Sequence, residues 1–184
     1  ERILLLAKDV TRADGGTIYT VTPEQTLHFE IVLSDTLSIH LGGSSKNVIS
    51  FPDMPMQLPD GQPNDSLMVA YAANHKQAIN IHDAYTEKGF DFSGTRAFDA
   101  KTGYRTQSVL TVPMMNHEGE VLAVLQLINP LNESTKQVEV FSDDDQQMAE
   151  SLSSLAGIAL TNQLLIANLR GLFDSLVQVI ASAI

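Results

Sequence analysis

Residues 109–128 decide the fold, and they read VLTVPMM at 109–115 and VLAVLQLI at 121–128. Both runs are apolar and contain β-branched residues, which is typical of buried β-strands. The connection between them, Asn116-His117-Glu118-Gly119-Glu120, is polar and contains a glycine. Because a short polar connection of this kind closes an antiparallel pair, the stretch predicts a β-hairpin.

The N-terminal part of the chain predicts a helix followed by a second hairpin. Residues 1–13 carry apolar side chains at helical spacing, and Asp14-Gly15-Gly16 follows as a helix breaker. Residues 17–21 and 27–32 have strand character, and a turn containing a proline joins them. The side chains expected to share one face of this hairpin are Thr17, Tyr19, Phe29 and Ile31.

The middle of the chain has two long stretches without periodicity. Residues 34–65 show no regular repeat of apolar positions, and residues 83–103 are irregular and rich in Phe, Tyr, Asp and Gly. Between them, a helix is predicted at about 66–75 and a short strand at 78–81. Loops of this length inside a compact domain are usually functional or mobile.

Residues 142–184 predict one long helix. Ser142 can cap its first turn, and Asp143-Asp144-Asp145 place negative charge at the positive end of the helix dipole. About the first four turns are expected to pack on the sheet of the same domain. The rest of the helix predicts a coiled coil, because apolar positions recur in alternating steps of three and four. The seam positions are Leu152, Leu155, Ala159, Asn162, Ile166, Leu169, Phe173, Leu176, Ile180 and Ala183.

The chain is therefore expected to divide into two parts. Residues 1–163 form a sensory domain whose first helix is truncated. Residues 164–184 form a signalling helix that pairs with a second copy of the chain and leads to an output domain beyond this sequence. The prediction is thus a homodimer held by the C-terminal helix.

Composition excludes several classes of function. The chain has 22 acidic and 11 basic residues and a net charge of −11, which argues against a nucleic acid or an anionic membrane as partner. Cys is absent, so disulfides, thiolate metal sites and Cys nucleophiles are excluded, and a reducing cytoplasm is the expected location. No uninterrupted apolar run is long enough to span a membrane.

Motifs within residues 64–163 resemble the GAF domain family. In order, they are NIHDAY at 80–85, FDAKTGYRTQS at 98–108, VPM at 112–114, NHEGEV at 116–121, LQLIN at 125–129 and FS at 141–142. The resemblance implies an α+β fold of the GAF-like, PAS-like type, with a central antiparallel sheet of five or six strands. It also implies that the terminal helices cover one face, and that a small-molecule pocket lies under the irregular loops on the other.

The resemblance also implies a function. The motifs are most similar to GAF domains of cyclic-nucleotide phosphodiesterases, bacterial adenylate cyclases and HD-GYP proteins. Residues 172–184 resemble the first helix leading into an HD-GYP domain, which hydrolyses cyclic di-GMP with a metal pair. The chain is then the regulatory part of a phosphodiesterase, without catalytic residues of its own. The alternatives are a dimerisation module without a ligand, the regulatory domain of a nucleotide cyclase, and an independent enzyme with the GAF fold.

By resemblance to cyclic-nucleotide-binding GAF domains, Asp99, Thr102 and Thr106 are marked as ligand contacts. Arg105 could add a charged donor for a phosphate. In the alternative interpretation, Asp99 and Thr102 cap a turn through their own side chains.

The chain departs from the cyclic-nucleotide motif at three places. The Asn-Lys pair of the relatives is Asn129-Pro130 here, and the later Asp-Glu pair is Asp145-Gln146. The Lys–Asp salt bridge of the motif therefore cannot form. The pocket Glu of the relatives is Gln126, whose amide both donates and accepts hydrogen bonds, so a change of ligand is expected. A cyclic nucleotide stays one candidate among unknown small molecules.

Aromatic residues complete the predicted pocket. Tyr85, Phe98 and Tyr104 lie in the irregular stretch and are assigned to its lining, although they could equally plug it as a small core. Phe29 and Thr17 are assigned to the floor by family analogy. The His residues lack the local spacing of a metal site, and no nucleophile–base motif is present, so neither a metal nor a catalytic residue is predicted.

Overall fold

The structure, a computed structural model, describes residues 1–182; the side chains of Leu176, Val179, Ala181 and Ser182 are outside the description, as is Ala183 of the predicted seam. A seven-stranded antiparallel sheet has the order β3-β2-β1-β7-β6-β5, and β4 pairs with β2. The strands are β1 (Ala13–Val21), β2 (Thr26–Ser34), β3 (Ile39–Gly42), β4 (Met54–Pro55), β5 (Ile79–Ile81), β6 (Val109–Met115) and β7 (Val121–Pro130). The helices are α1 (Arg2–Thr11), α2 (Met68–His75), α3 (Ser93–Thr102) and α4 (Asp143–Ser182).

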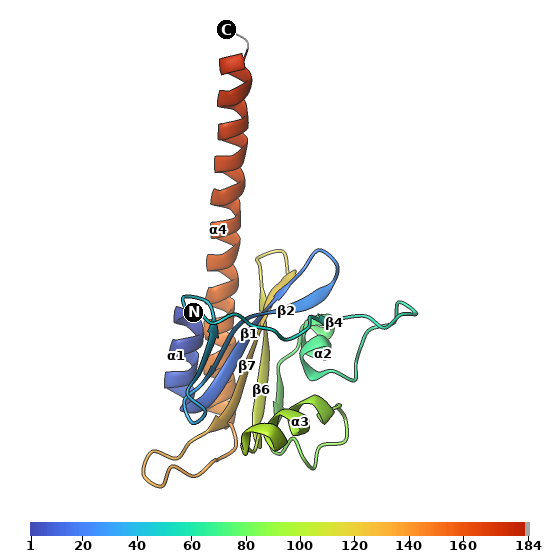
Figure 1. Cartoon of the computed structure of the whole chain (residues 1–184), viewed down its shortest axis with the longest axis vertical. Helices are drawn as coiled ribbons and strands as arrows, with labels where there is room; N and C mark the ends of the chain where they lie inside the picture. Colours follow the sequence, from blue (N-terminus) through green and yellow to red (C-terminus); the bar gives the residue numbers. More distant parts are fainter. Residues whose placement is uncertain (183–184) are drawn as a thin grey trace.

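Helices from the two ends of the chain cover one face of the sheet (Figure 1). α1 packs on β1, α4 packs on β6 and β7, and the two helices contact each other. α2 and α3 lie on the opposite side, where α2 contacts β6 and β7. The predicted α+β architecture, with terminal helices on one face and a long C-terminal helix, is confirmed.

The hairpin of β6 and β7 is buried on both faces. The two strands pair from Val109↔Ile128 to Met115↔Val121, as predicted. Leu125 and Leu127 of β7 point into the core beneath α1 and α4, whereas Gln126 points to the opposite side. Strands covered on both faces are apolar almost throughout, which explains why this stretch gave the clearest signal in the sequence.

A β-bulge in β2 corrects one expectation. Ile18 pairs with Ile31, but Tyr19 pairs with Phe29, so Glu30 is an extra residue in β2. Side chains alternate along a strand, and the extra residue therefore sends Ile31 into the core on the helix side. Phe29 stays beside Tyr19 on the other face.

The pair Gly15-Gly16 lies within β1, which begins at Ala13, and the prediction that it ends the first helix was wrong. α1 ends at Thr11, and Arg12 caps it in the left-handed conformation with φ of 56°. A Cβ atom on Gly16 would lie 2.6 Å from Cδ1 of Leu4. Glycine is therefore required because α1 lies directly on β1 at this point.

The prediction of an irregular stretch at 83–103 was wrong for half of its length, because α3 occupies Ser93–Thr102. Asp99 is the one buried residue of this helix, so the sequence has no apolar stripe that could reveal it. Gly103 ends α3 in the left-handed conformation, with φ of 72°.

α4 begins with the predicted cap. Ser142 Oγ accepts a hydrogen bond from the Asp145 backbone N–H (3.1 Å), and the Asp145 carboxylate accepts one from the Ser142 backbone N–H (2.9 Å). The helix packs on the sheet through Ala149, Ala156 and Gly157, and residues 162–175 are exposed. With 40 residues it is about 60 Å long at about 1.5 Å per residue. It runs through residue 163 without a break, so the domain boundary there stays a prediction.

Within residues 1–182, one helix is long and apolar enough to cross a membrane by length and composition. It is the segment Asp143–Ser175 of α4, whose most apolar 18-residue window has a mean hydropathy of 1.3 and is 17% buried. The absence of an uninterrupted apolar run did not predict this, because polar residues such as Asn162 and Gln163 interrupt the apolar positions of the helix. Since the first turns of the segment pack on the sheet, the criterion alone is weak support for a membrane span.

Gly157 generates a stability prediction. A Cβ atom there would collide with the backbone carbonyl of Met115, whereas nothing lies within 4 Å of a Cβ on Gly171. We expect Gly157→Ala to lower the free energy of unfolding by about 1–3 kcal/mol through overpacking. Gly171→Ala gains the same helix propensity without a clash and should leave it unchanged or raise it by up to about 1 kcal/mol. Urea denaturation followed by circular dichroism measures both, and equal midpoints would contradict the close packing of α4 on β6.

Candidate ligand-binding site

A cavity of about 500 Å³ lies between the sheet and the segments that cover its second face. β1, β2 and β7 supply its floor, while α2, α3 and residues 37–54 enclose it. Most of its lining is apolar or aromatic. The apolar lining residues include Phe29, Val32, Leu37, Ile39, Leu41, Phe51, Met54, Leu67, Met68, Val69, Phe92, Phe98, Val109 and Ile128.

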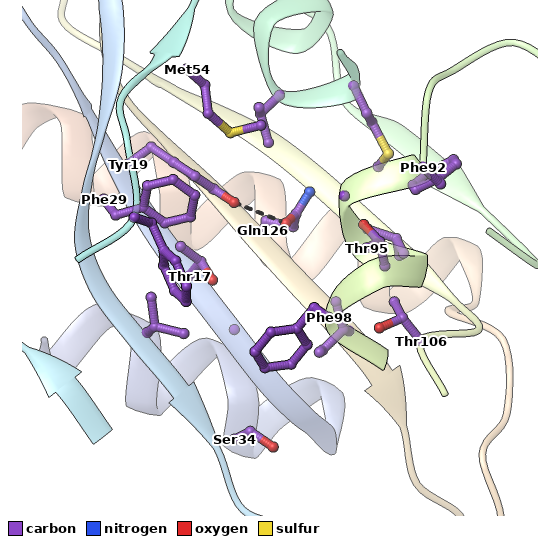
Figure 2. A pocket seen from close by; sticks show the side chains of 18 of the residues that line it. Thr17, Tyr19, Phe29, Ser34, Met54, Phe92, Thr95, Phe98, Thr106 and Gln126 are labelled. Atoms are coloured by element: carbon purple, nitrogen blue, oxygen red, sulfur yellow. Dashed lines mark hydrogen bonds between the residues drawn. The ribbon is translucent and has the colours of Figure 1, made fainter. Parts of the chain in front are cut away.

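A row of polar side chains crosses the floor. Thr17 of β1 pairs with Gln126 of β7, which pairs in turn with Thr111 of β6. Tyr19 OH donates to Gln126 Oε1 (3.2 Å), and Gln126 Nε2 donates to Thr111 Oγ1 (3.2 Å). Figure 2 shows Gln126 near the middle of the cavity, with Tyr19 on one side and α3 on the other. A central amide surrounded by apolar walls can orient a ligand through a few hydrogen bonds.

Tyr19 is held as a neutral hydrogen-bond donor. Its ring lies 4.7 Å from that of Phe29, and Phe29 lies 5.2 Å from Phe51, measured between centroids. Burial raises the pKa of Tyr19, and the hydrogen bond with Thr17 lowers it by less. The phenol therefore stays protonated at neutral pH, so it serves as a donor to Gln126 and not as a base.

α3 covers the opposite side of the cavity, with Thr95 and Phe98 facing inward (Figure 2). Asp91 precedes the helix, and its Oδ1 accepts the Ser93 backbone N–H (2.8 Å). This backbone bond, and then the Ser93 hydroxyl, hold the pKa of Asp91 below its usual value. A carboxylate of the chain itself thus occupies the positive end of α3.

The three residues of the cyclic-nucleotide motif are bonded within the protein. Asp99 is 2% exposed and accepts hydrogen bonds from the Thr106 backbone N–H (2.7 Å), Thr106 Oγ1 (2.9 Å) and Tyr85 OH (3.0 Å). Thr102 Oγ1 donates to the Phe98 carbonyl inside α3 (2.9 Å). Thr106 lines the cavity, whereas Asp99 and Thr102 do not.

Arg105 and Tyr85 lie outside the cavity lining. Arg105 Nη2 is 3.0 Å from Asp83 Oδ2, and its guanidinium lies 4.4 Å from the centre of the Tyr85 ring. The cation that the sequence suggested for a phosphate is therefore engaged elsewhere.

Two sets of polar contacts, joined by the backbone of residues 12–14, lie between the cavity and α4. Tyr104, which lines the cavity, donates its OH to Asp14 Oδ2 (2.7 Å) and accepts from Asn129 Nδ2 (2.9 Å). Burial, and then the bond to Asp14, raise the pKa of Tyr104, so it stays a donor. Arg12, two residues before Asp14, lies 3.5 Å from Asp145 of α4. Arg12 thus supplies Asp145 with the cationic partner that Pro130 cannot provide.

The structure therefore brings six of the ten predicted site residues to one cavity. They are Thr17, Phe29, Phe98, Tyr104, Thr106 and Gln126. Whether they contact a ligand stays a prediction. The sequence missed Phe51 and Met54, because the stretch that carries them has no periodicity. Among the described residues, no group of three His, Asp or Glu side chains could hold a metal ion.

Comparison with known proteins identifies the family. A family model described as "GAF domain" matches residues 1–160. The chain belongs to the GAF domain family. Domains of this family are typically sensory or regulatory.

Two curated relatives of this GAF domain are phosphodiesterases. The dual 3',5'-cyclic-AMP and -GMP phosphodiesterase 11A of Takifugu rubripes is 29% identical over 173 residues, which cover 94% of this chain and 17% of the relative. The cGMP-specific 3',5'-cyclic phosphodiesterase of Drosophila melanogaster is 33% identical over 90 residues, 49% of this chain and 7% of the relative. The chain thus spans less than a fifth of either enzyme.

A solved structure shows the same fold. The GAF domain of an Acinetobacter phosphoenolpyruvate-protein phosphotransferase superposes with a TM-score of 0.60 over 90% of this chain and 82% of that chain. Its sequence is 15% identical, so this likeness concerns the fold alone.

The Asp99 contacts generate a prediction about its role. We expect Asp99→Ala to leave the Thr106 and Tyr85 donors without their acceptor and to lower the free energy of unfolding by about 1–3 kcal/mol without any added ligand. Thr102→Ala, at an exposed position of α3, should change it by less than about 0.5 kcal/mol. Thermal or urea unfolding of the two variants measures both effects. Wild-type stability for Asp99→Ala would contradict a structural role for these three hydrogen bonds.

Proposed function

We propose that this GAF domain is the sensor of a larger signalling enzyme. A small molecule binds in the cavity, and the change is passed along α4 to a C-terminal output domain. The observation that carries this proposal is the cavity itself, which has apolar walls, a central amide at Gln126 and a volume in the range of small-molecule sites.

The proposed output domain is an HD-GYP phosphodiesterase acting on cyclic di-GMP. Its support is the sequence of residues 172–184, which resembles the helix that leads into such domains. The curated relatives, by their names, are also phosphodiesterases of cyclic nucleotides. An HD motif followed by Gly-Tyr-Pro downstream of Ile184 in the parent sequence supports this assignment, and a cyclase domain there contradicts it.

The proposal includes a homodimer through α4. Between residues 151 and 182, the only charged residues are Arg170 and Asp174. The seam residues Ile166, Leu169 and Phe173 are 50–66% exposed. A further row at seven-residue spacing, formed by Ile158, Leu165 and Leu172, lies beside the seam and is equally exposed.

The seam itself consists of two rows at seven-residue spacing, so together with the further row the exposed face of α4 carries three apolar rows. Their number indicates the kind of assembly. Two-stranded coiled coils usually carry charged residues beside the seam, whereas a three-row face is typical of helices in a bundle. Leu5 and Leu6 of α1 are also about half exposed, and α1 packs beside α4. We therefore propose that two copies of α4 pair through this face, with α1 from each copy completing the bundle near the domains.

The network behind Tyr104 offers a route from the cavity to α4. Its links are Tyr104 to Asp14 and Arg12 to Asp145, and it ends at the first turn of α4. A ligand that moves Tyr104 would change the first link directly, and it would reach the second only through the backbone between Asp14 and Arg12. The energy available equals the difference in ligand affinity between the two states, which is typically about 1–3 kcal/mol.

The dimer is tested by charge on the seam. We expect the double variant Leu169→Asp with Phe173→Asp to sediment as a monomer at concentrations where the wild type is a dimer, because two buried carboxylates per helix have no partner there. Ala167→Asp adds a charge on the opposite side of the helix and is the control that should stay dimeric. Unchanged mass for the double variant contradicts pairing through this face.

Ligand binding is tested by a thermal-shift screen with nucleotides and neutral metabolites. A ligand of the folded protein should stabilise it by about 2.7 kcal/mol at a hundredfold excess over Kd. The control is a variant in which Thr17→Phe fills the floor of the cavity, and it should lose the shift. A screen without a hit favours the dimerisation module and contradicts the sensor.

A further inference from the structure

The cavity lacks positive charge. Within the part of the chain that the structure describes, no Lys, Arg or His lines it, and Asp91 is its one charged lining residue. An ionised phosphate or carboxylate that enters an apolar site loses its hydration, and only a nearby cation or a set of free donors compensates the loss. The lining therefore disfavours an anion as a whole.

The place where an anion would gain most is already partly occupied, because Asp91 takes the Ser93 N–H, although not those of Gly94 and Thr95, which also line the cavity. Helix N-termini attract anions through their free N–H groups and the helix dipole. At α3, the carboxylate of Asp91 accepts the Ser93 N–H at 2.8 Å. A ligand phosphate at this point would meet a negative charge of the protein, and the net charge of −11 adds to the repulsion.

Cations near the cavity point elsewhere. Arg105 forms an ion pair with Asp83 and lies over the Tyr85 ring. Arg96, on α3, is exposed and outside the lining. Neither side chain lines the cavity, and the charge of Arg96 acts on Asp91, where, after the hydrogen bonds of Ser93, it helps to lower the pKa of that carboxyl.

The polar capacity of the floor suits an uncharged group. The Gln126 amide donates one N–H to Thr111 and accepts one hydrogen bond from Tyr19. An amide has two N–H donors and two acceptor lone pairs, so one donor and one lone pair remain for a ligand. A primary amide or a lactam presents the complementary pair of groups on one edge.

Aromatic rings bound the space on two sides. Phe29 lies on the floor of the cavity, and the Phe98 side chain extends from α3 into the cavity on the other side (Figure 2). Flat ring systems gain most from such walls through offset or edge-to-face contacts.

We infer that the cavity takes an uncharged, flat, mainly apolar molecule with an amide-like edge that bonds to Gln126, and not an anionic nucleotide. This inference rests on the proposed sensor function and specifies its ligand class.

The test uses pairs of compounds that share an aromatic ring system and differ in charge. Naphthalene-1-carboxamide is compared with naphthalene-1-carboxylate, and guanosine with cyclic GMP, within the screen of nucleotides and metabolites. The whole chain is titrated and the side-chain NH₂ signal of Gln126 is followed by ¹⁵N NMR. In each pair of which at least one member binds, we expect the uncharged compound to bind at least tenfold more tightly than the anion. Its binding should also change the chemical shift of the Gln126 side-chain NH₂ signal.

Variants locate the effect. Gln126→Leu should weaken carboxamide binding at least tenfold, whereas Gln137→Leu, at an exposed loop position, should leave it unchanged. Asp91→Asn should strengthen naphthoate binding at least threefold, because it removes the carboxylate from the end of α3. The charge preference is measured on the wild type as well, so a poorly folded variant does not decide the result.

The outcomes separate the two proposals. If the tightest ligand of the wild type is anionic, the inference about ligand charge is wrong and the sensor function stands. If no compound of either charge binds, both are wrong. If uncharged compounds bind best but Gln126→Leu binds them as well as the wild type, the amide edge is wrong.

Discussion

The register between β1 and β7 is the constraint on which the rest of the structure depends. Ile18 lies opposite Leu125, and Thr17 lies opposite Gln126. The first pair is buried beneath the terminal helices, and the second faces the cavity. A slip of one residue would exchange the two faces, burying the Gln126 amide in an apolar core and placing leucines on the cavity floor. The hydrophobic core on one side of the sheet therefore determines the chemistry on the other.

In the cyclic-nucleotide motif of this chain, the polar side chains of Asp99 and Thr106 are hydrogen-bonded within the protein. Asp99 and Thr106 bond to each other and close the loop between α3 and β6. Asn129 reinforces the same loop from β7 by accepting the Gln107 N–H and donating to the Arg105 carbonyl. Resemblance to nucleotide-binding relatives marks Asp99 by its position in the sequence. Its burial gives that carboxylate a structural reason for being there, whatever ligand the cavity takes.

The strongly periodic elements could be predicted from the sequence, and the elements defined by distant contacts could not. The hairpin at 109–128 and the capped start of α4 carry their own signals, because two-sided burial and a capping box are local patterns. α3 has a single buried residue and no apolar stripe, so only its packing over the cavity defines it. The same division holds in the site. Thr17, Phe29 and Gln126 follow from strand alternation and family position, whereas Phe51 and Met54 reach the cavity through the path of an aperiodic loop.

The close approach of Gly157 to Met115 turns the rest of α4 into a lever. From that contact to Ser182, the helix extends about 38 Å at about 1.5 Å per residue. A rotation of about 5° where α4 leaves the sheet would displace the far end by about 3 Å, given the same helix rise. A shift too small to disturb the packing of the sheet could in this way become a movement large enough to rearrange a neighbouring domain.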